Sequence, residues 1–324
     1  MAGHPHRNGS RSFLMEAALL AALLFSISAV CGYRSSLQIG GAEANFWRIC
    51  MATFCLALWA NLAGSGLESV AFPLFAASGF FGIGLGDTGY FQALPRLGSR
   101  RAVLLTQCFI PLFAILIEWL WLGTKLTSIE CLCIAVILTG VAIALAPSDH
   151  AKIPARQLWI GIAFTVFAGL CSAFGAVLSR KAYFVAHEAG ESLDPGTTGY
   201  YRVLGGLLIP AIILLAAKWR SAHAHGGVFE EKTLHISRTK WKRVWPWIFG
   251  NSLAGQTLGV TCVQWALEKT PTGIVMTVVA TTPLILLPMT RIVEKEKIGA
   301  RSLVGALVAV TGVVGLAHFH SHSK

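Results

Sequence analysis

The residues best suited to chemistry are polar side chains set inside apolar stretches of the chain. Asp87 is the clearest case, because it lies well inside such a stretch, between Gly82 and Gly89. An ionisable group at the depth of a lipid bilayer is costly and usually faces a cavity or a charged partner. Asp87 is therefore predicted to accept a proton or to pair with a cationic group of a solute. The alternative is a structural ion pair, for instance with Arg48.

Two glutamines form a second candidate group. Gln256 and Gln264 lie four residues before and after Val260, and residues four apart share one face of a helix. On that face they would hydrogen-bond a solute, or else join neighbouring helices to each other. Six further polar residues complete the set of candidate substrate-binding or coupling residues: Gln107, Glu118, Glu16, Arg48, Arg202 and Asn251.

Several members of this set also have a structural interpretation. Glu118 lies beside two tryptophans, which favour the membrane interface, so a water-exposed interfacial carboxylate is the leading expectation for it. Glu16, near the start of the first apolar stretch, carries the same alternative. Arg48 and Arg202 either extend toward lipid headgroups or bind an anionic group.

Membrane-spanning helices must position these residues, because the composition leaves little room for a soluble domain. Of 324 residues, 55% are apolar and only 13% are charged, against roughly 25% charged in soluble domains. This composition excludes a soluble enzyme with a single anchor, a disordered regulator and a nucleic-acid reader. The net charge of +11 then concerns orientation in the membrane rather than nucleic-acid binding.

Apolar runs between turn-forming residues predict ten helices in an all-α integral membrane protein. They lie near residues 13–32, 45–63, 70–92, 101–122, 127–146, 157–179, 199–217, 244–267, 273–290 and 302–319. The predicted organisation is a polar tail at 1–12, a five-helix repeat at 13–146, a connector at 147–156, a second five-helix repeat at 157–317 with a basic loop insertion at 218–243, and a histidine-containing tail at 318–324.

An internal repeat supports this division. The matched positions are Gly82, Gly86 and Thr88 with Gly255, Gly259 and Thr261, Pro111 with Pro283, and Arg48 with Arg202. Each copy holds five helices, an odd number, so the second copy enters the membrane from the opposite side. Inverted-topology repeats are typical of transporters, which alternate access around a site near the midplane. Pro111 and Pro283 are predicted to be paired hinges or bends.

Two stretches at matching places carry a family resemblance. Pro111 is followed by Leu-Gly-Thr-Lys-Leu-Thr at 122–127, and Pro283 is followed by Val-Glu-Lys-Glu-Lys at 293–297. Over roughly residues 13–317 this pattern resembles the drug/metabolite transporter (DMT) superfamily, and specifically EamA-type permeases with ten helices. The family usually has a glutamate after the first Leu-Gly, where this chain has Thr124, while Glu296 occupies the matching place in the second copy.

The resemblance implies a secondary transporter that moves a small metabolite, such as an amino acid, a nucleotide-related compound or a similar polar or amphipathic solute. Alternating access is the expected mechanism. Proton coupling, facilitated diffusion and exchange all stay open, as do import and export. The chain has no phosphate-binding Gly-x-x-x-x-Gly-Lys-Ser/Thr motif. We expect no enzymatic activity, cofactor, resident metal or nucleic-acid partner. The alternatives are a membrane scaffold or assembly protein, and an intramembrane enzyme acting on a lipid-linked substrate.

The orientation in the membrane has two conflicting indications. Tails and connectors on the side of the N-terminus carry 7 Lys and Arg residues, against 17 on the other side. The positive-inside rule therefore favours both termini outside the cytoplasm, whereas the resemblance implies both termini inside. The expected location in either case is the inner or plasma membrane of the cell.

Overall fold

The computed structural model describes residues 7–66, 68–97, 99–145, 154–224, 238–286 and 300–322, and within these ranges every regular element is a helix. The helices are α1 (Arg7–Ile39), α2 (Gly41–Leu62), α3 (Phe72–Gly79) running through η1 (Phe80–Leu85) into α4 (Gly86–Leu97), α5 (Ser99–Leu122), α6 (Ser128–Leu145), α7 (Ala155–Glu188), α8 (Pro195–Ala224), α9 (Arg238–Asn251) running through η3 (Ser252–Gly259) into α10 (Val260–Lys269), α11 (Thr272–Val279) and α13 (Ala300–His322). Residues 282–286 continue α11 after a turn. The predicted ten-helix, all-α architecture is confirmed.

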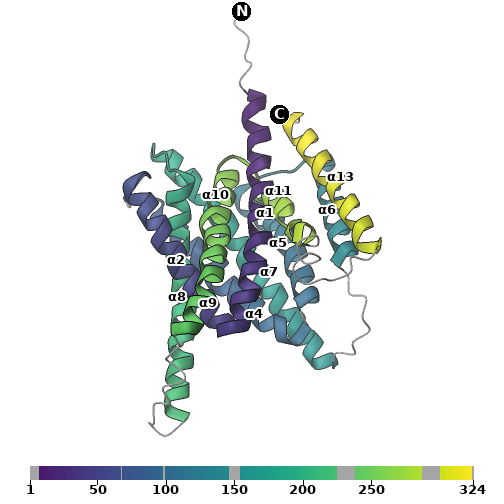
Figure 1. The fold of residues 1–324 in the computed structure, drawn as a ribbon. Helices are drawn as coiled ribbons and strands as arrows, with labels where there is room; N and C mark the ends of the chain where they lie inside the picture. The colour runs from purple at the N-terminus through teal and green to yellow at the C-terminus, as the bar shows by residue number, and fades with distance from the viewer. Residues whose placement is uncertain are drawn as a thin grey trace, which may run out of the picture.

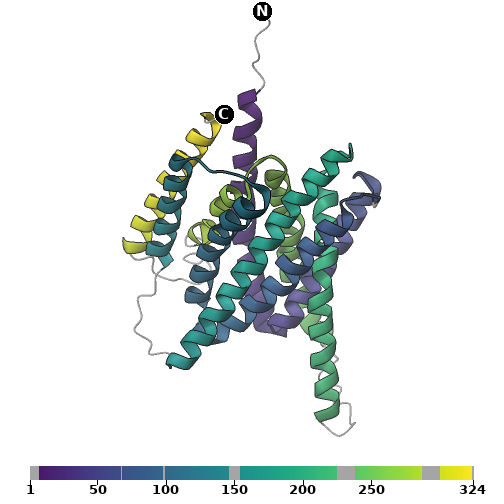
Figure 2. The same cartoon turned by 180° about the vertical axis from the view of Figure 1, so that it is seen from behind.

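The two halves of the bundle run in opposite directions. In Figures 1 and 2, α1 descends from the end that carries both chain termini, whereas α7, which opens the second half, ascends toward that end. We call the end with both termini the terminal face and the other end the opposite face. The terminal face carries the α2–α3, α5–α6, α7–α8 and α10–α11 connections. This arrangement is the inverted repeat that the sequence predicts.

Helix lengths and compositions differ across the bundle. Three described segments are by themselves long and apolar enough to cross a membrane: Leu104–Leu122, Ala155–Glu188 and Pro195–Ala216. Four shorter apolar segments accompany them: Glu16–Gly32, Ser128–Ala144, Thr272–Leu286 and Leu303–Leu316. The remaining helices include buried polar residues, such as Asn45, Ser78 and Gln264, which lower their mean hydropathy.

Both repeats contain a π-helical segment at the same place. η1 precedes Gly86 and η3 ends at Gly259, and these two glycines are matched in the internal repeat. A π segment widens the turn and frees a backbone carbonyl from its usual amide partner. In each repeat a threonine hydroxyl bonds a carbonyl at this place: Thr88 donates to the oxygen of Gly84 at 2.8 Å, and Thr261 to that of Thr257 at 2.7 Å.

Helices α6 and α13 pack together at the side of the bundle (Figures 1 and 2). A Cβ on Gly140 would lie 2.4 Å from the backbone nitrogen of Ala309, and one on Gly305 would lie 2.4 Å from that of Ala144. Glycine at both positions therefore lets the two backbones meet, as small residues do between membrane helices. This pair flanks the bundle and supplies none of the candidate site residues.

Several predicted boundaries differ from the structure. Helix α7 continues to Glu188 rather than ending at residue 179, so Arg180 lies inside a helix and not in a connector. Helix α8 runs to Ala224 and α9 starts at Arg238, which shortens the predicted 218–243 insertion. Residues 225–237 lie outside the described residues. Helices can extend past the membrane, where hydropathy no longer marks their ends.

Candidate functional site

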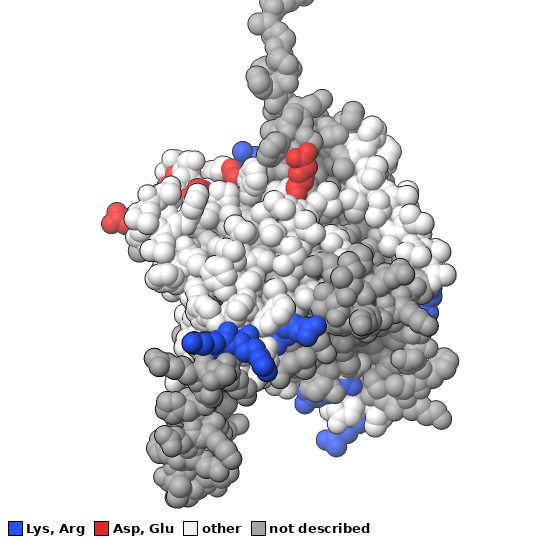
Figure 3. Space-filling model, in the orientation of Figure 1, with Lys and Arg blue, Asp and Glu red and all other residues white. Residues whose placement is uncertain are grey.

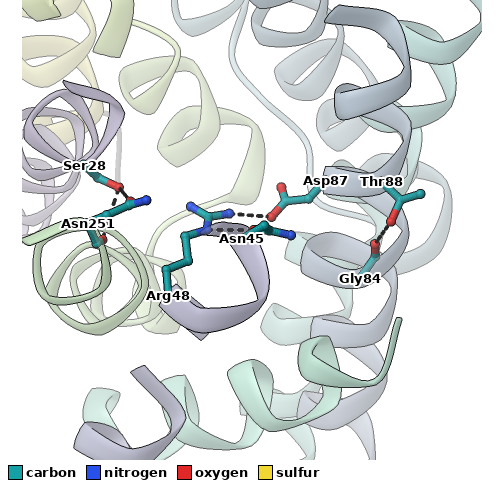
Figure 4. A network of polar contacts seen from close by, with 7 residues as sticks. All are labelled: Ser28, Asn45, Arg48, Gly84, Asp87, Thr88 and Asn251. Carbon is teal, nitrogen blue, oxygen red and sulfur yellow. Dashed lines mark hydrogen bonds and ion pairs between the residues drawn. The ribbon is translucent and has the colours of Figure 1, made fainter. Parts of the chain in front are cut away.

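An ion pair between α2 and α4 forms the centre of the candidate site. The Arg48 Nη2 atom lies 2.9 Å from Asp87 Oδ2, and Arg48 Nε donates to Asn45 Oδ1 at 2.7 Å. Figure 4 shows the guanidinium of Arg48 directed across from α2 toward the carboxylate. The two side chains are 16% and 29% exposed, so neither is completely enclosed by the bundle. The ion pair weighed as an alternative for Asp87 is present.

The local fold explains the position of both partners. Arg48 is the eighth residue of α2, about 10 Å along the helix at 1.5 Å per residue. Asp87 is the second residue of α4, immediately after η1, so the π segment sets the direction of its side chain. The pair therefore lies in the half of the bundle nearer the opposite face.

Arg202, the repeat counterpart of Arg48, has a different environment. It is 8% exposed, so of its two predicted alternatives the extension to lipid headgroups is wrong. Its Nη1 donates to Ser179 Oγ at 3.0 Å, and Ser179 Oγ lies 2.8 Å from Ser78 Oγ. Its buried Nε has no hydrogen-bond partner among the residues that the structure describes. No described carboxylate lies within ion-pair distance of Arg202.

The two predicted glutamines are both buried. Gln264 is fully enclosed, its Nε2 lies 3.5 Å from Ser179 Oγ, and its Oε1 accepts no hydrogen bond. The Oε1 of Gln256 likewise accepts none. Gln256 belongs to η3, where the four-residue rule of a regular helix does not apply. The structure therefore joins Gln264, but not Gln256, to the Arg202–Ser179 group.

A second ion pair, Glu118–Arg180, lies toward the terminal face. Arg180 Nε is 2.7 Å from Glu118 Oε1, and the side chains are 9% and 3% exposed. Arg180 also bonds the carbonyl of Thr270, and Glu118 Oε2 accepts from the amide of Gly273 at 3.3 Å. The pair thus joins α5, α7 and the α10–α11 turn. The prediction that Glu118 is exposed to water is therefore wrong. The neighbouring tryptophans indicated the membrane interface, but α7 covers this face of α5.

Sequence reasoning also missed Asp194, which precedes α8. Its carboxylate accepts hydrogen bonds from Trp59 Nε1 at 2.8 Å, from the amide of Ser65 at 2.9 Å, and from the amide and hydroxyl of Thr197 at 3.0 and 2.5 Å. Partial burial alone would raise the pKa of Asp194, but these hydrogen bonds outweigh it and lower the pKa to about 2. The sequence signal was an aspartate before a proline, which is typical of a helix N-terminus.

Glu191 makes a similar connection from the same loop. Its carboxylate accepts from Ser69 Oγ at 2.5 Å and from the amide of Val70 at 3.0 Å. The hydrogen bond from Ser69 is the main cause that lowers the pKa of Glu191. Together, Asp194 and Glu191 tie the α7–α8 loop to the α2–α3 loop on the terminal face.

The remaining candidates lie apart from these groups. The buried Asn251 accepts through Oδ1 from Ser28 Oγ at 2.5 Å and so joins α9 to α1 (Figure 4). Glu16 is exposed on α1, and Gln107 is half-buried in α5. None of these three contacts the Arg48–Asp87 pair through a described hydrogen bond.

The two predicted hinge prolines have different settings. Pro111 lies inside the continuous helix α5. Pro283 follows a break at Ala280–Thr281, where Thr281 and Thr282 bond the carbonyls of Val278 and Val279 through their hydroxyls. Only the second proline therefore accompanies an interruption of its helix.

Ten helices in two inverted repeats, with charged pairs enclosed between them, define a polytopic membrane protein of the transporter class. The family model described as the EamA-like transporter family matches residues 14–146 and 159–317. The chain belongs to this family, whose members are DMT-type transporters of small solutes. No curated protein sequence matches the chain.

Comparison with known structures supports the fold. Twenty-nine chains of known structure match. One crystal structure superposes with a TM-score of 0.73 at 13% sequence identity, over 96% of this chain and 98% of the other. At this identity the likeness shows the fold alone.

Proposed function

We propose that this protein moves a small polar solute across the membrane by alternating access, with the Arg48–Asp87 pair at the centre of binding and coupling. The observation that supports this proposal is the setting of the pair. Two opposite charges lie inside the bundle and are partly exposed. Asp87 follows directly after a π segment, and such a segment recurs in both repeats. π segments inside α-helices are frequent at functional sites.

The unequal closure of the two faces supports the alternating-access part of the proposal. In the half of the bundle nearer the terminal face, a Cβ on Gly79 would lie 1.6 Å from the carbonyl oxygen of Arg202, and one on Gly205 would lie 1.9 Å from that of Ala76. Helices α3 and α8 are thus in backbone contact there. The matching positions on α2 and η3 carry Met51 and Ser252 in place of glycine. The two repeat-related crossings therefore differ in side-chain size, and unequal crossings are expected in one end state of an alternating-access cycle.

Asp87 has the chemistry to couple transport to protons. Protonation of its carboxylate would remove one charge of the pair and release Arg48, while loss of the proton would restore the pair. A cationic group of the solute would compete with Arg48 for the same carboxylate. Both processes change which partner Asp87 holds, and a coupling residue needs two such alternatives.

The charge distribution supports an orientation in which the opposite face is cytoplasmic, in the inner or plasma membrane of the cell. In Figure 3 the basic side chains gather along the lower part of the molecule, and acidic side chains lie along the upper part. Exposed basic residues at that lower end include Arg156, Lys242, Arg243 and Arg301. The positive-inside rule places such a face in the cytoplasm.

The test compares the metabolites released and accumulated by cells that overproduce the wild type or Asp87→Asn, at matched levels in the membrane. We expect at least one compound whose distribution changes with the wild type and reverts with Asp87→Asn. Glu188→Gln is the matched control, because Glu188 is an exposed carboxylate on the terminal face and should leave transport unchanged. Transport that persists in Asp87→Asn, Gln256→Ala and Gln264→Ala would reject this site while leaving the family assignment intact.

A further inference from the structure

The two repeat-related arginines differ in their partners. Arg48 and Arg202 are each the eighth residue of their helix, α2 and α8. Arg48 pairs with Asp87, the residue after Gly86. The residue after the matching glycine, Gly259, is Val260. The second repeat therefore keeps the arginine but has an apolar side chain where the first has the carboxylate.

Val260, which replaces the carboxylate in the second repeat, lies close to Arg202. Val260 packs in one apolar cluster with Val203, the neighbour of Arg202, and with Ile49, the neighbour of Arg48. Its Cγ1 lies 3.8 Å from where a Cβ on Gly199 of α8 would be. Residue 260 therefore lies beside α8 within one turn of Arg202, as Asp87 lies beside α2 near Arg48.

One edge of the Arg202 guanidinium is unused. Arg48 uses its Nε and Nη2 for Asn45 and Asp87. Among the described residues, the guanidinium of Arg202 makes one hydrogen bond, from Nη1 to Ser179, and its Nε has none. Nη2 packs against η1 at Gly82, where a Cβ would lie 2.8 Å from it, so glycine at this position makes room for the guanidinium. The Nε and Nη2 edge of a guanidinium matches the two oxygens of a carboxylate or phosphate.

The charges around the site leave an excess of one positive charge. Arg48 and Arg202 are both cationic, and Asp87 interacts electrostatically with both of them. The described groups hydrogen-bonded to Arg202 directly or through Ser179 are neutral, namely Ser179, Ser78 and Gln264. A buried charge without a partner is costly. A bound anion would supply the partner that Val260 does not.

We infer that the cargo carries an anionic oxygen group, a carboxylate or a phosphate, which binds the Nε and Nη2 edge of Arg202. This inference rests on the proposed transport function and specifies the class of its substrate. Arg202 is then the residue that selects the charge of the cargo, and Asp87 the residue that couples its movement.

The experiment compares Val260→Asp with Val260→Asn, two variants of nearly equal shape that differ in charge. The full chain is purified in detergent, and its thermal unfolding is followed with anions and their neutral analogues: lactate against lactamide, succinate against succinamide, and glycerol phosphate against glycerol. We expect at least one anion to raise the Tm of the wild type and of Val260→Asn above the value with its neutral analogue. The carboxylate of Val260→Asp should occupy Arg202 and abolish this rise. The phosphate and carboxylate arms show which group is preferred.

Arg202→Gln is a second variant, which should lose the anion-dependent rise by removing the cation itself. The inference is overturned if no anion stabilises the wild type more than its neutral analogue does, or if Val260→Asp and Val260→Asn respond alike. The two proposals fail separately. A neutral or cationic compound whose transport depends on Asp87 would overturn the anion inference and leave the transport function in place. Anion binding by a protein that transports nothing would do the reverse.

Discussion

Helices α2 and α8 are equivalent in the internal repeat, and each has its arginine as the eighth residue. The residues that precede their first turns differ in chemistry. Helix α8 starts after Asp194, whose carboxylate accepts the amides of Gly196 and Thr197. Helix α2 starts after Gly40, which has a φ of 86° and no side-chain hydrogen bond to the helix. Asp194 connects the start of α8 to a neighbouring loop through Trp59 and Ser65, whereas no described side chain caps the start of α2.

This difference extends over the two faces of the molecule. Toward the terminal face lie the Asp194 hydrogen bonds, the backbone contact between α3 and α8, and the buried Glu118–Arg180 pair. Toward the opposite face lies the more accessible Arg48–Asp87 pair. Inverted repeats give the two faces equivalent backbones, so it is side chains that decide which face is held together. The free energy of unfolding of the protein in detergent measures how much the contacts toward each face contribute to stability.

The largest effect is expected from Glu118→Ala. Removing this carboxylate leaves Arg180 charged and unpaired in a buried place, and breaking such a pair costs about 3–5 kcal/mol. The free energy of unfolding, from thermal or denaturant unfolding, measures the loss. The double variant Glu118→Leu with Arg180→Met should recover most of it, because no charge then stays unpaired. Asp87→Asn, at the more exposed pair, should cost less, and equal losses at both pairs would contradict the comparison.

A smaller effect is expected from Gly205→Ala. The added Cβ would lie 1.9 Å from the carbonyl oxygen of Ala76, so α3 and α8 must separate, and overpacking of this kind costs about 1–3 kcal/mol. Gly199→Ala on the same helix is the matched control. Its nearest neighbour would lie 3.4 Å away, and alanine favours a helix over glycine by about 1 kcal/mol. A destabilised Gly199→Ala together with a tolerated Gly205→Ala would show that the backbones do not meet here.

The smallest effect is expected from Asp194→Ala, and it depends on pH. Loss of a helix N-cap costs about 1 kcal/mol. Because the pKa of Asp194 is lowered to about 2 in the folded protein, its contribution is fully present above its ordinary pKa near 4 and is lost as the pH falls toward 2. The difference in Tm between wild type and variant should therefore shrink between pH 4 and pH 2. A difference that stays constant over this range would mean that the ionised carboxylate does not hold the two loops together.

Much of the site was predictable from single residues, but their partners were not. Asp87 was recognisable because a carboxylate inside an apolar, glycine-rich helix is costly and usually faces a cavity or a charged partner. Arg180 was missed because hydropathy ended its helix at residue 179, although α7 continues to Glu188. Gln256 and Gln264 were assigned to one face by the period of a regular helix, which the π segment of η3 interrupts.

The sequence by itself determined the class of fold. Ten apolar stretches and a repeat with an odd number of helices require an inverted membrane bundle, because backbone groups in lipid must bond within a helix and each half must cross five times. Only the tertiary structure decided which charges meet. Arg48 and Arg202 are equivalent in sequence, yet one pairs with Asp87 and the other lies beside Val260. Such pairings depend on helix rotation, on π segments and on glycine contacts between segments far apart in the chain, and local sequence patterns contain none of these.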